Sequence, residues 1–353
     1  MKDAAGNTPK ELTNFEKKWR ESVSSGDTKD RMQELQRLQA LPLEEKIAIT
    51  NTKIKCWYES FNGNVAVSFS GGKDSSVLLH LVRQIYPEVP AVFCNTGLEY
   101  PEVVRHVKDT PNVVIMRPKM PFNQVLEKYG YPLVSKKVAR GISILRHPTG
   151  ANQNIYRLYD QGINRFGEKV SGFKVSNRWR FLIDAPFECS DKCCGAMKKE
   201  PMQRYQREHG RNQYVGTMAQ DSKAREKVYL QHGCNGYDLK DPKSTPMGFW
   251  TEQDVLKALL AYNIPFPSVY GEIRSKGSGL YCTGVKRTGC VFCMFALHME
   301  PSPGRFQKLY HSHPQLYRYC MDKLGIGDVL NYVWKNCPDR TTAQKFSGQI
   351  TLF

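Results

Sequence analysis

Residues 70–75 have the composition and setting of a loop that binds phosphate groups. They read Ser-Gly-Gly-Lys-Asp-Ser, follow the β-rich run 65–69 and precede a stretch with helical periodicity. Gly71 and Gly72 allow a tight turn and a close approach of the ligand, because neither carries a Cβ. The N–H groups of the turn and of the first helical residues would point at the phosphates. The loop lacks the Gly-x-x-x-x-Gly-Lys-Ser/Thr spacing of a Walker A motif.

The side chains of this loop add hydroxyl and charged groups to the predicted phosphate site. Lys73 supplies a positive charge, and Asp74 is the expected ligand of a Mg²⁺ ion that offsets the charge of leaving pyrophosphate. We therefore expect Lys73, Asp74 and Ser75 to take part in catalysis. The other loop residues expected to bind the phosphates of the nucleotide are Ser70, Gly71, Gly72 and Ser76.

Four of the eleven cysteines have spacings that suit a metal centre. In a chain expected to be cytoplasmic, thiols stay reduced, so metal or cluster ligation is favoured over disulfides. Cys193 and Cys194 are adjacent, and the two-residue gap between Cys290 and Cys293 lets both thiols reach one centre. Zinc remains an alternative, although adjacent cysteines fit a zinc ribbon poorly. Thiols expected to be buried or incidental are those of Cys56, Cys94, Cys234, Cys320 and Cys337.

The elements that must position these residues alternate between strand and helix from residue 64 onward. Strands are predicted at 65–69, 91–94 and 113–116, and helices at 74–85, 101–107 and 122–128. Strands separated by helices of this length predict an α/β fold with a parallel, doubly wound sheet. The predicted phosphate loop then joins the first strand to the first helix.

The pattern divides the chain into three parts. We expect a helical N-terminal arm at 1–55, a nucleotide-binding domain at 56–240 and a Cys-containing C-terminal region at 241–353. Within the arm, Glu16–Arg20 and Asp30–Leu35 resemble short amphipathic helices.

Two further stretches have a recognisable character. Residues 136–180 read as basic and irregular, and residues near 305–336 as helical. The chain has no run of about 18 apolar residues, and its N-terminus has no apolar core of a secretory signal. A cytoplasmic protein that does not enter a membrane is therefore expected.

The charge of the chain points to a polyanionic partner. Lys and Arg total 51 against 34 Asp and Glu, a formal net charge of +17. Such an excess favours nucleic acid, tRNA or DNA, while ordinary solvated surface is the alternative. Candidate contacts are Lys136, Lys137, Arg140, Arg178 and Arg180.

The loop and two other segments resemble the PP-loop ATP pyrophosphatases, in the branch that contains the phosphoadenosine phosphosulfate (PAPS) reductases. Residues 95–102, Asn-Thr-Gly-Leu-Glu-Tyr-Pro-Glu, are similar to the second motif of that branch, with Asn95 in place of its usual aspartate. Residues 216–225, Gly-Thr-Met-Ala-Gln-Asp-Ser-Lys-Ala-Arg, match the third motif. The resemblance covers roughly 60–300 and implies an adenine nucleotide alpha-hydrolase-like fold. It also implies nucleotide contacts by Thr96, Gly97, Gly216, Ser222 and Arg225.

A second resemblance concerns the cysteines. The segment from Cys193 to Pro201 resembles the Cys-Cys-x-x-x-Lys-x-x-Pro segment of adenylylsulfate-reductase-like members, which bind a 4Fe-4S cluster. This implies a cluster held by Cys193, Cys194, Cys290 and Cys293. The ATP pyrophosphatases of DNA phosphorothioation resemble the crowded layout from Cys282 to Cys293. Cys282 is therefore an alternative fourth ligand in place of Cys193, and Cys189 is a weaker one.

Three functions follow from these resemblances. The first is cleavage of ATP to AMP and pyrophosphate, which activates an acceptor for sulfur transfer; members that split ATP keep this loop complete. The acceptor would be tRNA, DNA or a small molecule, and a sulfur donor protein is a further possible partner. The second is reduction of a sulfonucleotide to sulfite, but the Glu-Cys-Gly-x-His motif of such reductases is missing before Phe353. The third is a nucleotide-binding or nucleic-acid-binding module without turnover. His298 is a candidate base, or else a structural residue.

Overall fold

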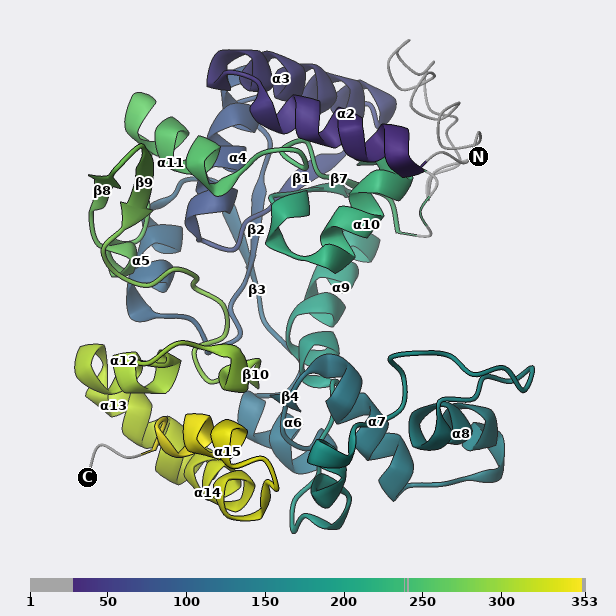
Figure 1. Cartoon of the computed structure of the whole chain (residues 1–353). Helices are drawn as coiled ribbons and strands as arrows, with labels where there is room; N and C mark the ends of the chain where they lie inside the picture. The colour runs from purple at the N-terminus through teal and green to yellow at the C-terminus, as the bar shows by residue number, and fades with distance from the viewer. Residues whose placement is uncertain (1–27, 238, 240, 351–353) are drawn as a thin grey trace. The chain divides into compact units, whose positions relative to one another are not determined.

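The computed structural model describes residues 28–350 except 238 and 240, and these form two compact units (Figure 1). The sheet unit comprises residues 28–95, 99–117 and 201–288. The helical unit comprises residues 96–98, 118–200 and 289–350. Each unit is assembled from segments that interleave along the chain. The three consecutive parts expected from the sequence remain a prediction.

The sheet unit is built on six strands in the order β3-β2-β1-β5-β7-β6. All pair in parallel except β6, which runs antiparallel to β7 at the edge of the sheet. The predicted α/β fold with a parallel sheet is confirmed. The strands are β1 Val65–Ser68, β2 Ala91–Cys94, β3 Val113–Met116, β5 Asn212–Val215, β6 Asn235–Gly236 and β7 Lys243–Ser244.

Helices cover both faces of this sheet, which makes it doubly wound. Val65 and Val67 of β1 belong to the large core on one face, whereas Ala66 packs with Val92 and Tyr205 on the other. This alternation follows from the two-residue period of a strand. The helices of the unit are α2 Thr28–Ala40, α3 Leu43–Ser60, α4 Lys73–Ile85, α5 Pro101–Asp109, α9 Glu200–His209, α10 Lys223–His232 and α11 Glu252–Ala261.

The predicted N-terminal arm contributes two helices to the sheet unit. Residues Asp30–Leu35 lie in α2, so this predicted helix is confirmed, while Glu16–Arg20 lies outside the described residues. Lys46 of α3 forms a buried ion pair with Asp254 of α11, with 2.7 Å between nitrogen and oxygen. Because a buried charge is stable only when it is paired, this contact fixes α3 against α11.

In the helical unit, one short strand segment joins two distant parts of the chain. Strand β4, Leu133–Val134, pairs in parallel with β10, Met294–Phe295, and Tyr131 bridges to Cys189. Val134 and Ala296 both have positive φ, 63° and 64°, and Ala296 N donates to Val134 O at 2.8 Å. Non-glycine residues rarely adopt this conformation, and it is especially unfavourable for a β-branched side chain. The pairing is therefore strained.

The remaining elements of the helical unit are mostly helices (Figure 1). They are α6 Phe122–Tyr129, α7 Lys136–Arg146, α8 Gln153–Gln161, the 3-10 helix η2 Asn177–Asp184, the π-helix η3 Gly195–Lys199, α12 Arg305–Ser312, α13 Pro314–Arg318, α14 Ile326–Asn336 and α15 Arg340–Ser347. The helical character near 305–336 is confirmed. The irregular structure predicted at 136–180 is wrong, because α7, α8 and η2 lie there. Among the described residues, no helix has the length and apolar character needed to cross a membrane.

Candidate nucleotide site and cysteine sites

The predicted phosphate loop connects β1 to α4 in the sheet unit, as its sequence requires. Gly71 has φ +70°, and a Cβ there would lie 2.7 Å and 2.8 Å from methyl groups of Val107 and Val103 on α5. Gly72 is the N-cap of α4 and carries no side chain over the first turn. Both glycines are therefore needed, Gly71 for the turn and its packing and Gly72 for access to the helix N-terminus.

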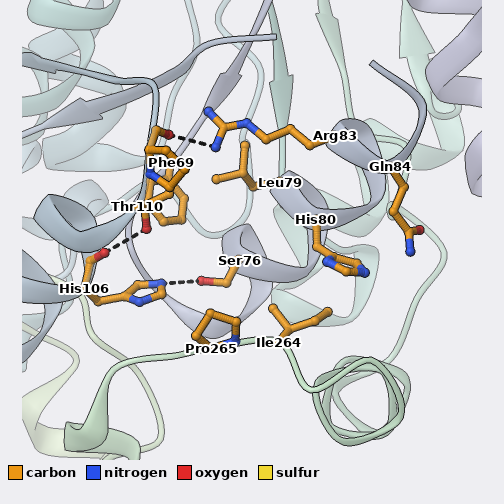
Figure 2. A pocket seen from close by; sticks show the side chains of 11 residues that line it. Phe69, Ser76, Leu79, His80, Arg83, Gln84, His106, Thr110, Ile264 and Pro265 are labelled. Atoms are coloured by element: carbon orange, nitrogen blue, oxygen red, sulfur yellow. Dashed lines mark hydrogen bonds between the residues drawn. The ribbon is translucent and has the colours of Figure 1, made fainter. Parts of the chain in front are cut away.

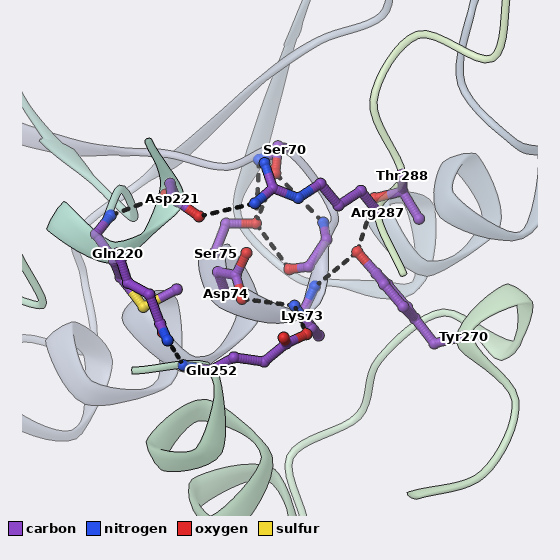
Figure 3. Close-up of polar contacts among 12 residues, drawn as sticks. Ser70, Lys73, Asp74, Ser75, Gln220, Asp221, Glu252, Tyr270, Arg287 and Thr288 are labelled. Atoms are coloured by element: carbon purple, nitrogen blue, oxygen red, sulfur yellow. Dashed lines mark hydrogen bonds and ion pairs between the residues drawn. The ribbon is translucent and has the colours of Figure 1, made fainter. Parts of the chain in front are cut away.

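The hydroxyls of Ser70 and Ser75 form hydrogen bonds within the loop and stabilise its conformation. The Ser75 hydroxyl donates to Gly72 O at 2.9 Å, accepts from Ser70 N at 3.2 Å and lies 3.0 Å from the Ser70 hydroxyl (Figure 3). Ser75 is buried at the start of α4. The loop is therefore cross-linked within itself.

Lys73 lies between two carboxylates at the start of α4. Its Nζ is 3.1 Å from Asp74 Oδ1 and 3.4 Å from Glu252 Oε1, at the N-terminus of α11 (Figure 3). Burial lowers the pKa of Lys73, but the carboxylate of Asp74, with Tyr270 and Glu252, raises it above the ordinary value. Burial raises the pKa of Asp74, against the opposing charge of Lys73. Lys73, the only cationic side chain in residues 70–75, therefore forms ion pairs with two carboxylates.

Tyr270 and Thr288 place two hydroxyls over the turn at Gly72. The Tyr270 hydroxyl accepts from Lys73 N at 3.4 Å and lies 2.8 Å from Thr288 Oγ1. A Cβ on Gly72 would lie 3.0 Å from each of these oxygens. Tyr270 is almost fully buried, and burial raises the pKa of its hydroxyl, which therefore stays neutral. The N–H group of Lys73, which a phosphate would bind, already has a polar partner.

The segment matched to the third family motif also lies beside the loop. A Cβ on Gly216 would approach Asp74 O and Ser75 Cα to 3.4 Å, so Gly216 allows close packing on α4. Asp221 is paired with Arg225 and, at 3.7 Å, with Arg287, and its charge helps to raise the pKa of Asp74. Ser222 caps α10, where its side chain accepts from Arg225 N at 3.3 Å.

A cavity of about 360 Å³ lies on the α4–α5 side of the sheet unit. Ser76 faces this cavity, and its hydroxyl is 3.0 Å from His106 Nε2 (Figure 2). Burial lowers the pKa of His106, and also that of His80, which lines the same cavity. Ser76, predicted to bind phosphate, is thus engaged with α5 in this structure.

Thr96 and Gly97, predicted from the second family motif, belong to the helical unit. Thr96 is buried, and its hydroxyl accepts from Leu98 N at 3.2 Å. Gly97 has φ +73° with open space where a Cβ would stand. Leu98 O accepts from Val291 N at 2.9 Å, so this motif contacts the Cys290–Cys293 segment.

Four of the predicted ligand cysteines lie in the helical unit, and three of them act on the pKa of Cys193. Cys193 Sγ donates to Cys194 Sγ at 4.0 Å, which raises the pKa of Cys193 and lowers that of Cys194. Cys290 and Cys293 raise the pKa of Cys193 further. The segments meet because 131–134 pairs with Cys189 on one side and with β10 on the other. Within the described part of the chain, no three His, Cys, Asp or Glu side chains are arranged to hold a single metal ion.

The two alternative ligands lie in different surroundings. Cys282 ends β9, Gly279–Cys282, in the sheet unit, where burial raises its pKa and Lys73 and Glu252 also act on it. Cys189 is buried in the helical unit, and burial raises its pKa to about 12. His298 packs edge-on against Trp179 at 5.2 Å and stacks on Phe346, so it is embedded among aromatic rings.

Several residues at the loop were not found from the sequence. Glu252 lies within the Thr-x-x-Asp capping box of α11, which predicts a helix start but not a contact with Lys73. Tyr270 lies in a segment without a recognisable motif, and Thr288 lies two residues before Cys290. Their positions over the loop depend on long-range packing.

The fold defines an α/β protein in which a glycine turn joins β1 to α4. Residues 64–133 match the family described as the phosphoadenosine phosphosulfate reductase domain. This segment contains the loop, β2 and the second motif. The resemblance to PAPS reductases predicted from the motifs is confirmed over this segment.

Curated relatives match different lengths of the chain. An uncharacterized protein of Methanocaldococcus jannaschii is 25% identical over 291 residues, 80% of this chain and 48% of that protein. The chain spans about half the length of this relative and of a second one from the same organism. The phosphoadenosine 5'-phosphosulfate reductase of Alkalilimnicola ehrlichii is 23% identical over 226 residues, 64% of this chain and 72% of that enzyme.

Two solved structures are distantly similar to the chain. The PAPS reductase of Candida auris in a phosphate complex has a TM-score of 0.36 and 16% identity, covering 67% of this chain and 96% of that one. The U34-tRNA thiolase NcsA of Methanococcus maripaludis, with its 4Fe-4S cluster, has a TM-score of 0.34 and 14% identity, covering 88% and 81%.

Proposed function

We propose that the protein is a PP-loop enzyme that binds ATP and cleaves it to AMP and pyrophosphate, activating an acceptor for sulfur transfer. The observation that carries this proposal is the complete loop at residues 70–75, which leaves the N-terminus of α4 without a side chain at Gly72. Pyrophosphate is a suitable ligand for such a site, because N–H groups and the helix dipole both favour an anion there. The match to the PAPS reductase domain supports an adenine nucleotide.

In the proposed reaction, an acceptor oxygen attacks the α-phosphorus of ATP and pyrophosphate leaves. A sulfur nucleophile then displaces AMP from the adenylated acceptor, so that the carbon–oxygen bond is replaced by a carbon–sulfur bond. The loop binds the β- and γ-phosphates, and Lys73 neutralises charge that develops on the leaving group. Tyr270 and Thr288 limit the space above Gly72.

A magnesium ion would fit the carboxylate side of this site. Asp74 offers oxygen ligands, and its pKa is raised in part by the nearby carboxylates of Asp221 and Glu252. Oxygen donors with excess negative charge suit a hard cation. Asp74 is the residue that would hold Mg²⁺, which would supply charge neutralisation for pyrophosphate.

A 4Fe-4S cluster is proposed for the cysteines of the helical unit. Its ligands would be Cys193, Cys194, Cys290 and Cys293, and the last three all raise the pKa of Cys193. Lys136 and Lys198 favour the thiolate of Cys194, and such positive charge suits a thiolate-ligated cluster. The cluster would supply a centre that binds sulfur.

A second candidate is reductive cleavage of a sulfonucleotide to sulfite, favoured by the family match. The two reactions release different products and can be separated directly. Anaerobically purified protein would be incubated with ATP, with adenylylsulfate or with PAPS, in the presence of tRNA, DNA or small acceptors. Release of pyrophosphate from ATP is the expected result, with release of AMP once a sulfide source is added to displace it from the acceptor. Sulfite from a sulfonucleotide, without pyrophosphate from ATP, would establish the reductase instead.

A further inference from the structure

The loop that leads from α8 to η2 in the helical unit presents an aromatic side chain to solvent. This presenting loop comprises residues 162–175. Val170 N donates to Gly162 O at 2.7 Å, and Ile163 forms an antiparallel bridge with Lys169. The two sides of the loop therefore pair as in a hairpin, and residues 164–168 form its tip.

Asn164 fixes the conformation of this tip. Its side-chain oxygen accepts from Phe166 N at 2.9 Å and from Glu168 N at 3.0 Å, and its amide donates to Glu168 at 2.8 Å. Its backbone oxygen accepts from Arg157 of α8 at 3.0 Å. An Asn that bonds to the backbone two and four residues ahead stabilises a turn. The tip is thus held in one shape before any partner binds.

Phe166 is the exposed aromatic residue at this tip. The residue is 72% exposed, and the guanidinium carbon of Arg165 lies 4.6 Å from the centre of its ring. Phe173, on the returning side of the loop, instead packs edge-on against Tyr159 and is 40% exposed. Phe166 thus presents a flat apolar surface, with a planar cation stacked on it, without any role in the core.

The surroundings of Phe166 are strongly basic. Residues 136–180 contain ten Lys and Arg but only two Asp and Glu, a net charge of +8 out of the +17 of the whole chain. Asp160, one of the two acids, is paired with Arg180 at 2.7 Å. Arg165, Lys169 and Lys174 of the presenting loop are all exposed. A polyanion is therefore the complementary partner.

We propose that the presenting loop binds single-stranded RNA, with an unpaired base stacked on Phe166 and with Arg165, Lys169 and Lys174 close to phosphates. Exposed aromatic rings beside Arg and Lys are the usual means by which proteins hold unpaired bases. RNA is favoured because its loops display unpaired bases, whereas duplex DNA keeps its bases stacked. This inference deepens the proposed function by naming the polymer that carries the acceptor. It is tested by binding alone, without ATP, so either proposal can fail independently.

The experiment measures binding of a fluorescently labelled 12-nucleotide single-stranded RNA by anisotropy at several salt concentrations. Phe166→Ala should weaken binding roughly tenfold, the effect of losing one stacked base, and leave the salt dependence unchanged. Phe166→Trp should retain affinity and show quenching of its added fluorescence. Lys169→Gln should reduce the slope of affinity against salt by about one. Phe173→Ala, an aromatic of the same loop packed on Tyr159, is the matched control and should bind as the wild type.

Three results would overturn the proposal. One is unchanged RNA affinity of a Phe166→Ala protein whose unfolding temperature equals that of the wild type. Another is equal or tighter binding of duplex DNA of the same length. The third is binding to vesicles of anionic phospholipid, lost in Phe166→Ala, with no binding of RNA.

Discussion

The hydroxyl oxygen of Tyr270 lies 3.4 Å from the backbone nitrogen of Lys73, although 197 positions separate the two residues in the chain. The hydroxyl therefore occupies a donor at the N-terminus of α4 that a phosphate oxygen would use. Binding of a nucleotide at this loop would exchange one partner of that N–H group for another. This exchange makes the nucleotide site testable through Tyr270.

Tyr270→Phe should destabilise the free protein by about 1 kcal/mol, the usual net value of a hydrogen bond. Saturating ATP should remove most of the difference, because the phosphate then replaces the tyrosine hydroxyl at Lys73 N. Thermal unfolding with and without ATP measures both effects, and Tyr281→Phe on β9 is an exposed control. An equal deficit at saturating ATP would contradict this exchange.

Substitution of Gly71 should lower the stability of the fold, whereas substitution of Gly72 should abolish ATP binding. Gly71→Ala should destabilise the fold by about 1–3 kcal/mol, because its φ is +70° and a Cβ would strike Val103 and Val107. Gly72→Val has ordinary φ and should fold, but should lose ATP binding in calorimetric titration. A folded Gly72→Val protein with unchanged affinity would refute the phosphate site.

Glu252→Gln should strengthen pyrophosphate binding. The substitution removes one of two carboxylates that compete for Lys73, while the amide keeps the shape of the side chain. The gain should be roughly two- to fivefold, the range of a solvent-exposed ion pair. Glu272→Gln breaks the exposed pair with Arg274 in the same unit and is the control. Unchanged or weaker binding in Glu252→Gln would show that Glu252 does not oppose the anion.

Mild acid should destabilise the protein through His106. Burial lowers the pKa of His106 in the folded protein, whereas the unfolded chain binds a proton near the ordinary value of about 6.5. The unfolded state then holds more protons as the pH falls below about 6.5, so stability falls by at most about 1.4 kcal/mol per pH unit for this residue. Denaturant unfolding at pH 5 and pH 7 measures the effect. His106→Gln should reduce the pH dependence, and exposed His311→Gln should not.

Serine substitution of each cysteine should rank the proposed cluster ligands. Cys193→Ser, Cys194→Ser, Cys290→Ser and Cys293→Ser should each lose iron and sulfide after anaerobic purification. Cys282→Ser should retain them, because the resemblance of the Cys193–Pro201 segment implies Cys193 as the fourth ligand. Cys320→Ser, a buried thiol of the helical unit, is the control. A colourless wild type with stoichiometric zinc would contradict the cluster.

The parts of the fold that could be predicted from sequence are those with local signals. The predicted strand 65–69 and helix 74–85 agree with β1 and α4 to within one residue at each end, because alternating and helical periodicities meet at a pair of glycines. Strands β6 and β7 are two residues long and carry too little pattern to be seen. Helix α7 was hidden by its four basic residues, although it buries an apolar face, and the short α8 buries only Tyr159.

The contacts made by the loop depend on tertiary packing. Lys73 could be assigned a charge from sequence, but its pairing with Glu252 depends on α11 packing beside α4. The hydroxyl of Ser75 looked like a phosphate ligand, and in the structure it cross-links the loop. The residue type at such positions shows which interactions the side chain can form. The tertiary packing determines which partner it contacts.

The strained backbone at Val134 and Ala296 has a consequence for amide hydrogen exchange. A residue held at such a positive φ costs about 1–3 kcal/mol, and Val134 in β4 and Ala296 just after β10 keep this conformation only if neighbouring contacts hold it. The Ala296 amide should then exchange with solvent through local opening, well before the amides of β1 in the central sheet. A cluster that joined Cys194 to Cys293 would hold the flanking segments together and slow that opening. The exchange rate of the Ala296 amide would thus show whether a cluster joins Cys194 to Cys293.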